Sequence, residues 1–477
     1  MLPDDAAEGM YGDDSPAAAF ATTPGNSALT LIRCSGRGAI ETFSSVFARP
    51  AGAKKITDIP GNSVVHGWIV LNGSEKIDEV LVSVFRAPKS YTGEDSLDIC
   101  CHGGLSAGKA VMDALKHAGF RGALPGEFTF RAFMNGKLDL TRCESVMEIV
   151  RARTDTSRRR AVSRLGGFLE TEINEIKKML VEILSGAEIC LDYSEDEISP
   201  GDEDGGLSGQ DTALQAFQRL KKLSASWQLE RIYQEGITAV IAGRPNAGKS
   251  SLFNAMLKEE RSIVTEAPGT TRDWIEAWVS VQGIPVRLID TAGLRESADS
   301  AEKMGVERSR KLLLEADIVL YLIDGENGVT DEDRIFCAEC AGNLLVVWNK
   351  ADIAPAPLNT AAFPERQLQA IKPVITSAKT GSGLEELYGA IVSAVQDRLP
   401  DIPGDCAIAL GTERQKNLVD TACRALEEAL SLAGNDEPLD LIAPLLREAV
   451  NALGEITGEV STADILEDMF SRFCVGK

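Results

Sequence analysis

The spacing of apolar residues predicts two kinds of structure before residue 236. Apolar residues at helical spacing predict a helix over 105–117. Short runs in which apolar and polar residues alternate predict strands at 27–33, 67–71, 80–85 and 97–101. Between 143 and 184 the apolar positions follow a helical period with no proline, and a second helical run spans 212–234. We therefore expect a small α+β domain with a predominantly antiparallel sheet, followed by an all-α segment.

The pattern changes at residue 237, where strands and helices begin to alternate. Apolar runs predict strands at 237–242, 286–289, 318–323, 344–348 and 374–375. This alternation is typical of an α/β fold with a doubly wound parallel sheet. After residue 397 helical spacing returns, at 414–433, 440–456 and 463–473.

The simplest architecture inserts the α/β domain, 237–396, into a helical domain built from both flanks, 138–236 and 397–477. Residues 17–137 then form the N-terminal α+β domain, and the acidic stretch 1–16 is expected to be a disordered extension. Periodicity alone leaves open whether the two helical flanks pack together.

A phosphate-binding motif follows the first predicted strand of the α/β domain. Residues 243–250 read Gly-Arg-Pro-Asn-Ala-Gly-Lys-Ser and match G-x-x-x-x-G-K-[ST]. Such a turn points backbone N–H groups at phosphate oxygens, at the positive end of a helix dipole. We expect Lys249 to reach the β- and γ-phosphates and Ser250 to bind Mg²⁺.

Two further stretches predict which base the site binds. Asn349-Lys350-Ala351-Asp352 follows a predicted strand, and Ser377-Ala378-Lys379 follows the next one and is expected to close over the base. The Asp352 carboxylate can accept hydrogen bonds from the N1–H and amino groups of guanine, a donor pair that adenine lacks. The motifs therefore predict GTP rather than ATP.

The remaining parts of a GTPase site come from two switch motifs. In Asp290-Thr291-Ala292-Gly293 the aspartate supports Mg²⁺ through water, and the glycine N–H meets the γ-phosphate. Gly269-Thr270-Thr271-Arg272-Asp273 supplies Thr271 as a second Mg²⁺ ligand. Leu294 directly follows Gly293, at the position where Ras-type GTPases have a glutamine that orients the attacking water. A leucine side chain cannot orient water. Glu296 and Glu302 are both candidates for that role.

The overall charge limits how the chain can meet nucleic acid. The formal net charge is −23 at pH 7, so no general basic field attracts RNA, and an RNA substrate needs a local patch or a basic partner. One group of arginines forms either such a patch or a solvated helix face: Arg151, Arg153, Arg158, Arg159, Arg160 and Arg164.

Other protein classes are excluded by composition. There is no apolar run of roughly 18 residues, and the N-terminus lacks the regions of a signal peptide, so we expect a cytoplasmic protein with no membrane partner. The ten cysteines are scattered without a disulfide framework, and the three histidines all precede residue 120, which argues against a His-based triad. The acidic run 193–206 does not fit an EF-hand and is expected to be a solvated loop.

Motifs outside the α/β domain are the most specific. The chain ends Phe473-Cys474-Val475-Gly476-Lys477, and further distinctive stretches lie at 91–95, 102–104, 125–133, 135–140 and 453–459. Together with 243–250, 269–273 and 290–295, they resemble the MnmE (TrmE) family of tRNA-modifying GTPases from about Ala17 to the last residue.

The resemblance implies a reaction, partners and a fold. Members of the family act with the FAD-dependent protein MnmG (GidA) to attach an aminomethyl or carboxymethylaminomethyl group to C5 of the wobble uridine of certain tRNAs. The one-carbon unit comes from 5,10-methylenetetrahydrofolate or a related folate. The implied fold is multidomain: an α+β folate-binding-like domain that forms a homodimer, an all-α domain, and an inserted Ras-like α/β P-loop GTPase domain. The amine donor, glycine or ammonium, stays open.

The resemblance also assigns residues near the folate. Arg33, Asp98, Lys137 and Lys477 fall where the family contacts it, and Asp98 stands where many members have the longer glutamate. Arginine and lysine suit the carboxylates of a folate. Two readings of Cys474 remain: a nucleophile that adds to C6 of uracil and activates C5, or a residue that packs beside the folate pocket.

The family's GTPase is activated by K⁺ and by G-domain dimerisation. By resemblance, Asn246 is a K⁺ ligand and oxygens of Thr265, Ala267 and Thr270 complete the site, while the match over 302–307 makes Glu302 the water-positioning residue. The GTP-binding residues so implied are Asn246, Ala247, Gly248, Lys249, Ser250, Ser251, Thr265, Glu266, Ala267, Pro268, Gly269, Thr270, Thr271, Asp290, Thr291, Ala292, Gly293, Asn349, Lys350, Asp352, Ser377, Ala378 and Lys379.

A second function remains open beside a tRNA modification enzyme. The chain is then a regulatory GTPase switch, of the ribosome-assembly or scaffold type, without modification chemistry of its own. The N-terminal motifs and Phe473–Lys477 speak against an assembly switch, but the sequence does not show how chemistry is divided with MnmG.

Overall fold

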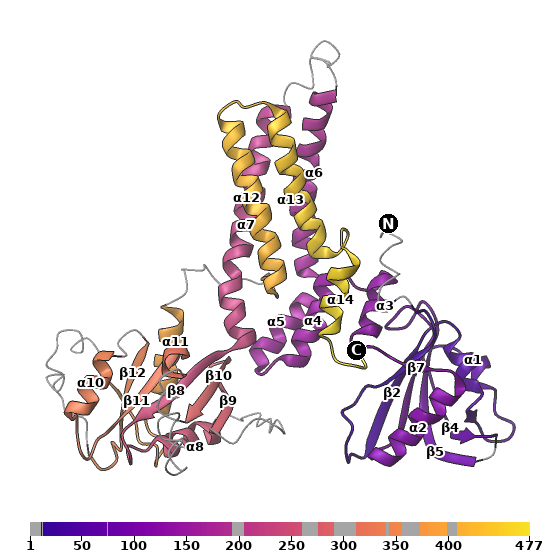
Figure 1. Ribbon diagram of the computed structural model, residues 1–477, viewed down its shortest axis with the longest axis horizontal. Coiled ribbons are helices and arrows are strands. Elements are labelled where there is room, and N and C mark those ends of the chain that lie inside the picture. Colours follow the sequence, from indigo (N-terminus) through magenta and orange to yellow (C-terminus); the bar gives the residue numbers. More distant parts are fainter. Residues whose placement is uncertain are drawn as a thin grey trace, which may run out of the picture. The chain divides into compact units, whose positions relative to one another are not determined.

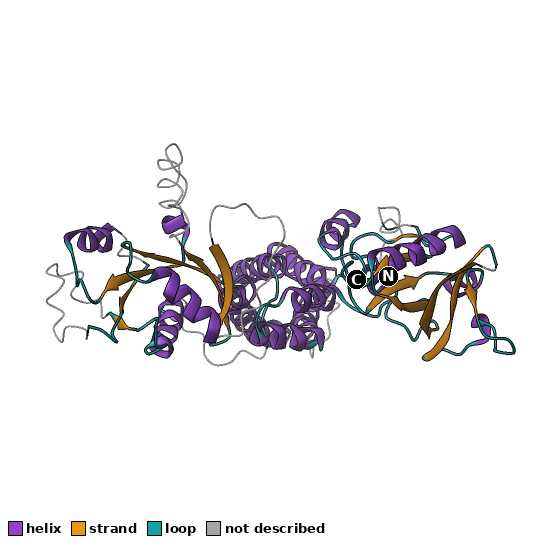
Figure 2. Cartoon of the chain, turned by 90° about the horizontal axis from the view of Figure 1, so that it is seen from below, coloured by secondary structure: helices purple, strands orange, loops and turns teal. Residues whose placement is uncertain are grey.

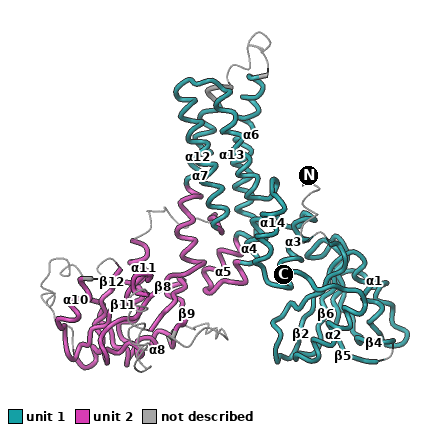
Figure 3. The backbone as a smooth tube through the Cα atoms, viewed as in Figure 1, with its two compact units in different colours: residues 1–147, 164–221, 413–477 teal, residues 148–163, 222–412 magenta. Residues whose placement is uncertain are grey.

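The structure is a computed structural model that describes residues 11, 13–73, 75–192, 205–259, 275–290, 312–339, 343–354, 373–397 and 408–477. The chain forms two compact units, coloured separately in Figure 3. Unit 1 comprises residues 1–147, 164–221 and 413–477, and unit 2 comprises 148–163 and 222–412. Among the described residues, no helix has the length and apolar composition needed to cross a bilayer.

Unit 1 begins with a seven-stranded sheet in the order β3-β4-β5-β6-β2-β1-β7, in which only the β1–β7 pair is parallel. The strands are β1 (Ala17–Phe20), β2 (Leu29–Ser35), β3 (Phe47–Ala48), β4 (Ser63–Leu71), β5 (Glu75–Phe85), β6 (Ser96–His102) and β7 (Arg121–Gly122). Helices α1 (Ala39–Ser44) and α2 (Leu105–Ala118) and the 3-10 turn Ile56–Asp58 pack on one face. The predicted antiparallel α+β fold is therefore confirmed.

Alternation along β2 decides which side chains reach the second face of this sheet. Ile32 and Cys34 point into the core under the helices, so Arg33 between them points the other way. Arg33 pairs in register with Asp98 of β6, which shares that face. The same face leaves Leu29, Val64 and Leu81 58%, 65% and 50% exposed.

The helices of unit 1 come from both sides of the inserted segment. They are α3 (Glu127–Met134), α4 (Leu140–Arg151), α6 (Phe168–Asp192), the first part of α7 (Gly205–Glu235), α12 (Glu413–Gly434), α13 (Leu439–Thr457) and α14 (Ala463–Ser471). Helix α13 packs along both α12 and α6, and Figure 2 views this bundle nearly end-on. The two helical flanks, whose packing the periodicity left open, thus share one bundle.

The continuous helix expected over 143–184 is wrong, because the structure breaks it into α4, α5 (Asp155–Leu165) and α6. Thr154 ends the first stretch: its Oγ1 accepts the Ser157 N–H at 3.1 Å, as a helix N-cap does. Gly167 makes the second break with φ +88°. Neither break is made by a proline. Among the residues that end a helix, the prediction took account only of proline, which is absent from this stretch, and not of an N-cap threonine or a glycine.

The N-terminal extension is partly ordered, in contrast to the expected disorder of 1–16. The Tyr11 hydroxyl donates to the Pro125 carbonyl at 2.7 Å, and its ring stacks on Phe130 with centroids 4.8 Å apart. The backbone carbonyls of Asp13 and Ser15 accept hydrogen bonds from Arg131. Residues 1–10 lie outside the described part of the chain.

Unit 2 contains a six-stranded sheet in the order β13-β12-β11-β8-β10-β9, parallel except for the β9–β10 hairpin. The strands are β8 (Ile237–Gly243), β9 (Ile275–Val281), β10 (Ile284–Asp290), β11 (Ile318–Asp324), β12 (Leu344–Asn349) and β13 (Val374–Ile375). Helices α8 (Lys249–Glu259) and α11 (Leu384–Gln396) cover one face and α10 (Asp331–Glu339) the other. The predicted doubly wound sheet is confirmed, and Figure 1 labels β8, β9, β10, β11 and β12. Strand β9 was not predicted.

Candidate functional site

The P-loop forms the turn between β8 and α8, where the motif predicted it. Asn246 and Gly248 have left-handed backbones, with φ +65° and +94°. A Cβ on Gly248 would lie 2.2 Å from Asn349 Nδ2, so only glycine fits there. The Lys249 ammonium turns back across the loop and donates to the carbonyls of Gly243 at 3.0 Å and Arg244 at 2.9 Å. The lysine therefore lies across the loop, beside the N-terminus of α8.

Two oxygen-bearing side chains expected at Mg²⁺ lie together beside this loop. Asp290 ends β10, which runs parallel to β8, and Ser250 lies in the first turn of α8. The Ser250 hydroxyl donates to Asp290 Oδ2 at 2.8 Å, and Asp290 is 1% exposed. A hydroxyl and a carboxylate are hard oxygen donors of the kind that Mg²⁺ prefers, so these residues fit the ion.

The base-recognition motif is tied to the P-loop by Asn349. Its Nδ2 donates to the Ala247 carbonyl at 2.8 Å, and its Oδ1 accepts the Ala378 N–H at 3.0 Å. Asn349 is 2% exposed, so its amide is committed to these backbone partners. The asparagine thus holds the phosphate loop and the 377–379 turn at a fixed spacing.

The two charged residues of the motif are each oriented by a neighbour. Ser377 Oγ donates to Asp352 Oδ1 at 2.6 Å, and this hydrogen bond lowers the pKa of Asp352. Lys350 Nζ donates to Asp324 Oδ2 at 2.8 Å, which raises the pKa of Lys350. Asp352 therefore remains a charged hydrogen-bond acceptor at neutral pH.

Part of the expected site lies outside the described residues. This part includes the two switch segments and both candidates for positioning the water. Its residues are Thr265, Glu266, Ala267, Pro268, Gly269, Thr270, Thr271, Thr291, Ala292, Gly293, Glu296 and Glu302. Of the expected K⁺ ligands, Asn246 is described and is exposed at the tip of the P-loop. Ser251 is exposed in α8, one residue beyond Ser250.

In unit 1, two of the residues expected near folate, Arg33 and Asp98, lie on the open face of the sheet. Arg33 and Asp98 form a bidentate pair, with Nε–Oδ1 and Nη2–Oδ2 distances of 2.9 and 3.1 Å. The ring centroid of Tyr91 lies 5.5 Å from the Arg33 guanidinium carbon, and its hydroxyl is 3.0 Å from Thr129 Oγ1. Lys137 Nζ donates to the Pro88 carbonyl at 3.1 Å, at the start of the loop that carries Tyr91.

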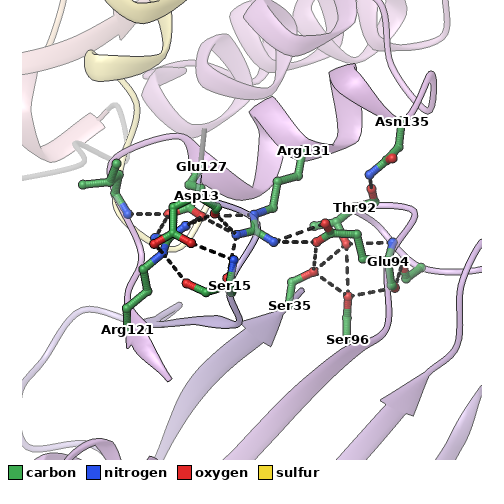
Figure 4. A network of polar contacts seen from close by, with 12 residues as sticks. Asp13, Ser15, Ser35, Thr92, Glu94, Ser96, Arg121, Glu127, Arg131 and Asn135 are labelled. Atoms are coloured by element: carbon green, nitrogen blue, oxygen red, sulfur yellow. Dashed lines mark hydrogen bonds and ion pairs between the residues drawn. The ribbon is translucent and has the colours of Figure 1, made fainter. Parts of the chain in front are cut away.

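A polar network fixes this loop, as Figure 4 shows. Arg131 donates to Glu94 at 2.9 Å and to the fully buried Glu127 at 2.8 Å. Asn135 Nδ2 donates to the Thr92 carbonyl at 2.8 Å. Helix α3 and Asn135, which follows it, therefore hold the 91–96 loop, and with it the position of the Tyr91 ring.

The C-terminal tail lies against the same sheet domain. Val475 pairs with Pro125 in an antiparallel bridge, and the Gly126 N–H donates to the Cys474 carbonyl at 3.3 Å. A Cβ on Gly476 would lie 2.3 Å from the Phe20 carbonyl, which places the tail at the end of β1. Because Ala19 of β1 pairs with Arg33 of β2, the tail ends near the Arg33 strand. Cys474 itself is exposed.

Comparisons with known proteins match these motifs over the whole chain. A family model described as "MnmE helical domain" matches residues 140–474, and one described as "GTP-binding protein TrmE N-terminus" matches residues 16–137. The tRNA modification GTPase MnmE of Treponema denticola is 41% identical over 476 residues, covering 98% of this chain and 99% of that protein. The chain belongs to the MnmE family.

One further relative and one solved structure are also similar to this chain. The tRNA modification GTPase MnmE of Carboxydothermus hydrogenoformans is 40% identical over 471 residues, covering 96% of this chain and 99% of that protein. The solved G domain of the T. maritima FeoB iron transporter is 28% identical, covers 34% of this chain and 99% of that chain, and has a TM-score of 0.26. As a member of the MnmE family with a P-loop and an N-K-x-D motif, the chain is a GTPase.

Three residues that contact the candidate sites were given no role by sequence reasoning. Tyr91 stood inside a recognised stretch, 91–95, but no role was given to its ring. Asp324 carried a usable signal, since it ends the strand paired with the strand of Asn349. Arg244 was treated only as a variable position of the P-loop motif, and nothing in the sequence named its partner.

The arginine group does not form one uniform face. Arg160 donates to the buried Glu230 at 2.6 Å, and Arg153 stacks on Trp278 at 3.5 Å. Arg164 is 4% exposed, so it is not a surface residue. Arg158 and Arg159 both pair with Asp155 and have side chains that are 50% and 75% exposed. Arg151 and Arg153 are exposed as well, so the described arginines do not single out one pair for a phosphate contact.

Proposed function

We propose that this GTPase acts with an FAD-dependent partner of the MnmG type to attach an aminomethyl or carboxymethylaminomethyl group to C5 of the wobble uridine of certain tRNAs. The curated relatives are named tRNA modification GTPases, and a tRNA substrate follows from that name. The observation that carries the proposal is the placement of Cys474 and Lys477 on the domain that bears Arg33 and Asp98. Since the substrate is tRNA, we place the reaction in the cytoplasm.

In this proposal, GTP binding and hydrolysis at the nucleotide site control when the modification reaction takes place. Lys249 and the loop N–H groups bind the phosphates, Ser250 and Asp290 hold Mg²⁺ with Thr271, and Asp352 selects guanine. Glu302 positions the attacking water, because Leu294 has no polar atom with which to do so. A K⁺ ion held by Asn246, Thr265, Ala267 and Thr270 balances the charge that develops on the phosphates.

The Arg33 cluster fits a folate by the chemistry of its donors. The bidentate pairing with Asp98 holds the guanidinium flat, and the half-buried Tyr91 ring offers a surface for a planar ring system. Lys137 and Lys477 supply cations for carboxylates. When bound, 5,10-methylenetetrahydrofolate or a related folate supplies the one-carbon unit, and these side chains bind and orient it.

The exposed thiol of Cys474 favours its role as a nucleophile over a packing role. Its addition to C6 of uracil would activate C5 for substitution. The open face of the sheet, with Leu29, Val64 and Leu81 exposed, supports homodimerisation through the N-terminal domain.

Mass spectrometry of tRNA nucleosides from a strain that lacks the gene tests the proposal. We expect the C5-modified wobble uridine to be lost and to be restored by the wild-type gene. Arg33→Ala should fail to restore it, whereas Arg37→Ala, at an exposed arginine of the same domain, should restore it. Normal modification in the deletion strain would refute the proposal and favour a regulatory GTPase switch without modification chemistry.

A further inference from the structure

The side chain of Arg244, the second residue of the P-loop, bonds to residues outside its motif. Its Nε donates to Asp333 Oδ1 at 3.1 Å, and its Nη2 donates to the Gly328 carbonyl at 3.3 Å. Gly328 lies in the β11–α10 connection and Asp333 in the first turn of α10, both more than 80 residues further along the chain. The phosphate loop is therefore fastened to a segment that no GTPase motif includes.

Asp333 is a fully satisfied, buried carboxylate. It is 0% exposed, and its Oδ2 accepts the N–H and the hydroxyl of Thr330, both at 2.8 Å. Its Oδ1 accepts the Tyr321 hydroxyl at 2.8 Å in addition to Arg244. Burial and the neighbouring carboxylate raise the pKa of Tyr321, so the phenol remains a donor. In this network Arg244 is the cation that faces the buried charge of Asp333.

The same connection is fastened to the base-recognition motif at its other end. Asp324 Oδ2 accepts Lys350 Nζ and Asn327 Nδ2, each at 2.8 Å, and the Asp324 carbonyl accepts the Gly328 N–H at 2.9 Å. Burial alone would raise the pKa of Asp324, but the hydrogen bonds, first that from Lys350, lower it. A continuous chain of bonds thus runs from Lys350 through Asp324 and Gly328 to Arg244.

We propose that Arg244 and Asp333 are positioning residues for the nucleotide: they set the P-loop at a fixed place relative to Lys350. The carbonyl of Arg244 is also one of the two acceptors of Lys249, so a shift of residue 244 moves the phosphate-binding lysine. Release of the guanidinium from Asp333 frees the loop, and the nucleotide must then order the loop when it binds. The proposal concerns GTP binding and is independent of the tRNA chemistry.

The test measures GDP affinity with a fluorescent GDP analogue, and kcat and KM for GTP, on the full chain. We expect Arg244→Gln and Asp333→Asn each to weaken GDP binding about tenfold, as expected for the loss of one charge-assisted hydrogen bond that orders the loop. KM for GTP should rise, whereas kcat should stay within about twofold of the wild-type value. The reason is that the P-loop binds the nucleotide in both the ground state and the transition state. The double variant should lose no more than either single variant.

Two further variants separate positioning from simple stabilisation. Arg334→Gln removes an exposed ion pair with Asp331 on the same helix, α10, and should leave GDP affinity unchanged. Arg244→Lys keeps a cation beside Asp333 but loses the fork to Gly328, so it should bind GDP with a strength between wild type and Arg244→Gln. It also keeps the test valid where Arg244→Gln does not fold. Wild-type GDP affinity in folded Arg244→Lys and Asp333→Asn, or additive losses in the double variant, would overturn the proposal.

Discussion

Replacing Glu127 by glutamine should loosen the whole N-terminal domain. The Glu127 side chain is 1% exposed and lies between Arg121 and Arg131. Its Oε1 accepts three hydrogen bonds from the two guanidinium groups, and its Oε2 accepts one from Arg121 at 2.7 Å and one from the Leu124 N–H at 2.8 Å. A glutamine that keeps the first oxygen must place its NH₂ against the Arg121 and Leu124 donors.

The size of the effect follows from these contacts. Two partly buried donors lose their acceptor, at roughly 1–3 kcal/mol each. Arg121 retains Asp13 at 3.0 Å and Arg131 retains Glu94 at 2.9 Å, so neither cation is left without an anion. We therefore expect a loss of about 3 kcal/mol, the low end of the range for breaking a buried ion pair.

Hydrogen exchange of the full chain measures this loss through the amides of β2 and β6. A change of about 3 kcal/mol corresponds to exchange faster by on the order of 10²-fold. The matched control is Glu79→Gln, which removes an exposed pair with His66 and should cost about 0–1 kcal/mol.

The effect also has a defined pH dependence. Burial alone would raise the pKa of Glu127, but the hydrogen bonds from Arg121, Leu124 and Arg131 lower it below the unfolded value. The carboxylate therefore stabilises the domain fully above its unfolded pKa, and this stabilisation is lost as pH falls through the lower folded pKa. Exchange that matches wild type at pH 7, or a gap that persists unchanged far below the unfolded pKa, would refute this reasoning.

Two predictions concern the nucleotide site. The Ser377 hydroxyl lowers the pKa of Asp352, so Ser377→Ala should raise that pKa. GDP affinity, measured as a function of pH, should then begin to fall at a higher pH than in the wild type. The same pH dependence in both proteins would contradict this. GTP hydrolysis at equal ionic strength should be faster in KCl than in NaCl, and Asn246→Ala should lose the difference; equal wild-type rates in both salts would remove the proposed K⁺ site.

The nucleotide site could be predicted to the extent that its parts are local. Each motif is a short segment at the carboxyl end of a strand, and parallel register brings those ends to one edge of the sheet. Asp290 lies opposite Ile241 of β8, and Asp324 lies opposite Asn349 of β12. The partners of Arg244 were not predictable in this way, because they depend on which loop of the second helical layer covers the P-loop.

The position of the C-terminal tail, like the partners of Arg244, could not be predicted from the local sequence. Its sequence identified Cys474 and Lys477, but its position comes from aromatic packing: Phe470 is fully buried, 5.4 Å from the ring of Phe130 and 5.2 Å from that of Phe473. Phe130 belongs to α3, the helix that also carries Glu127 and Arg131. One short helix thus seats the tail with its apolar side and the 91–96 loop with its charged side. A change that moves α3 must therefore disturb Cys474 and Tyr91 together, although they lie more than 380 residues apart in the sequence.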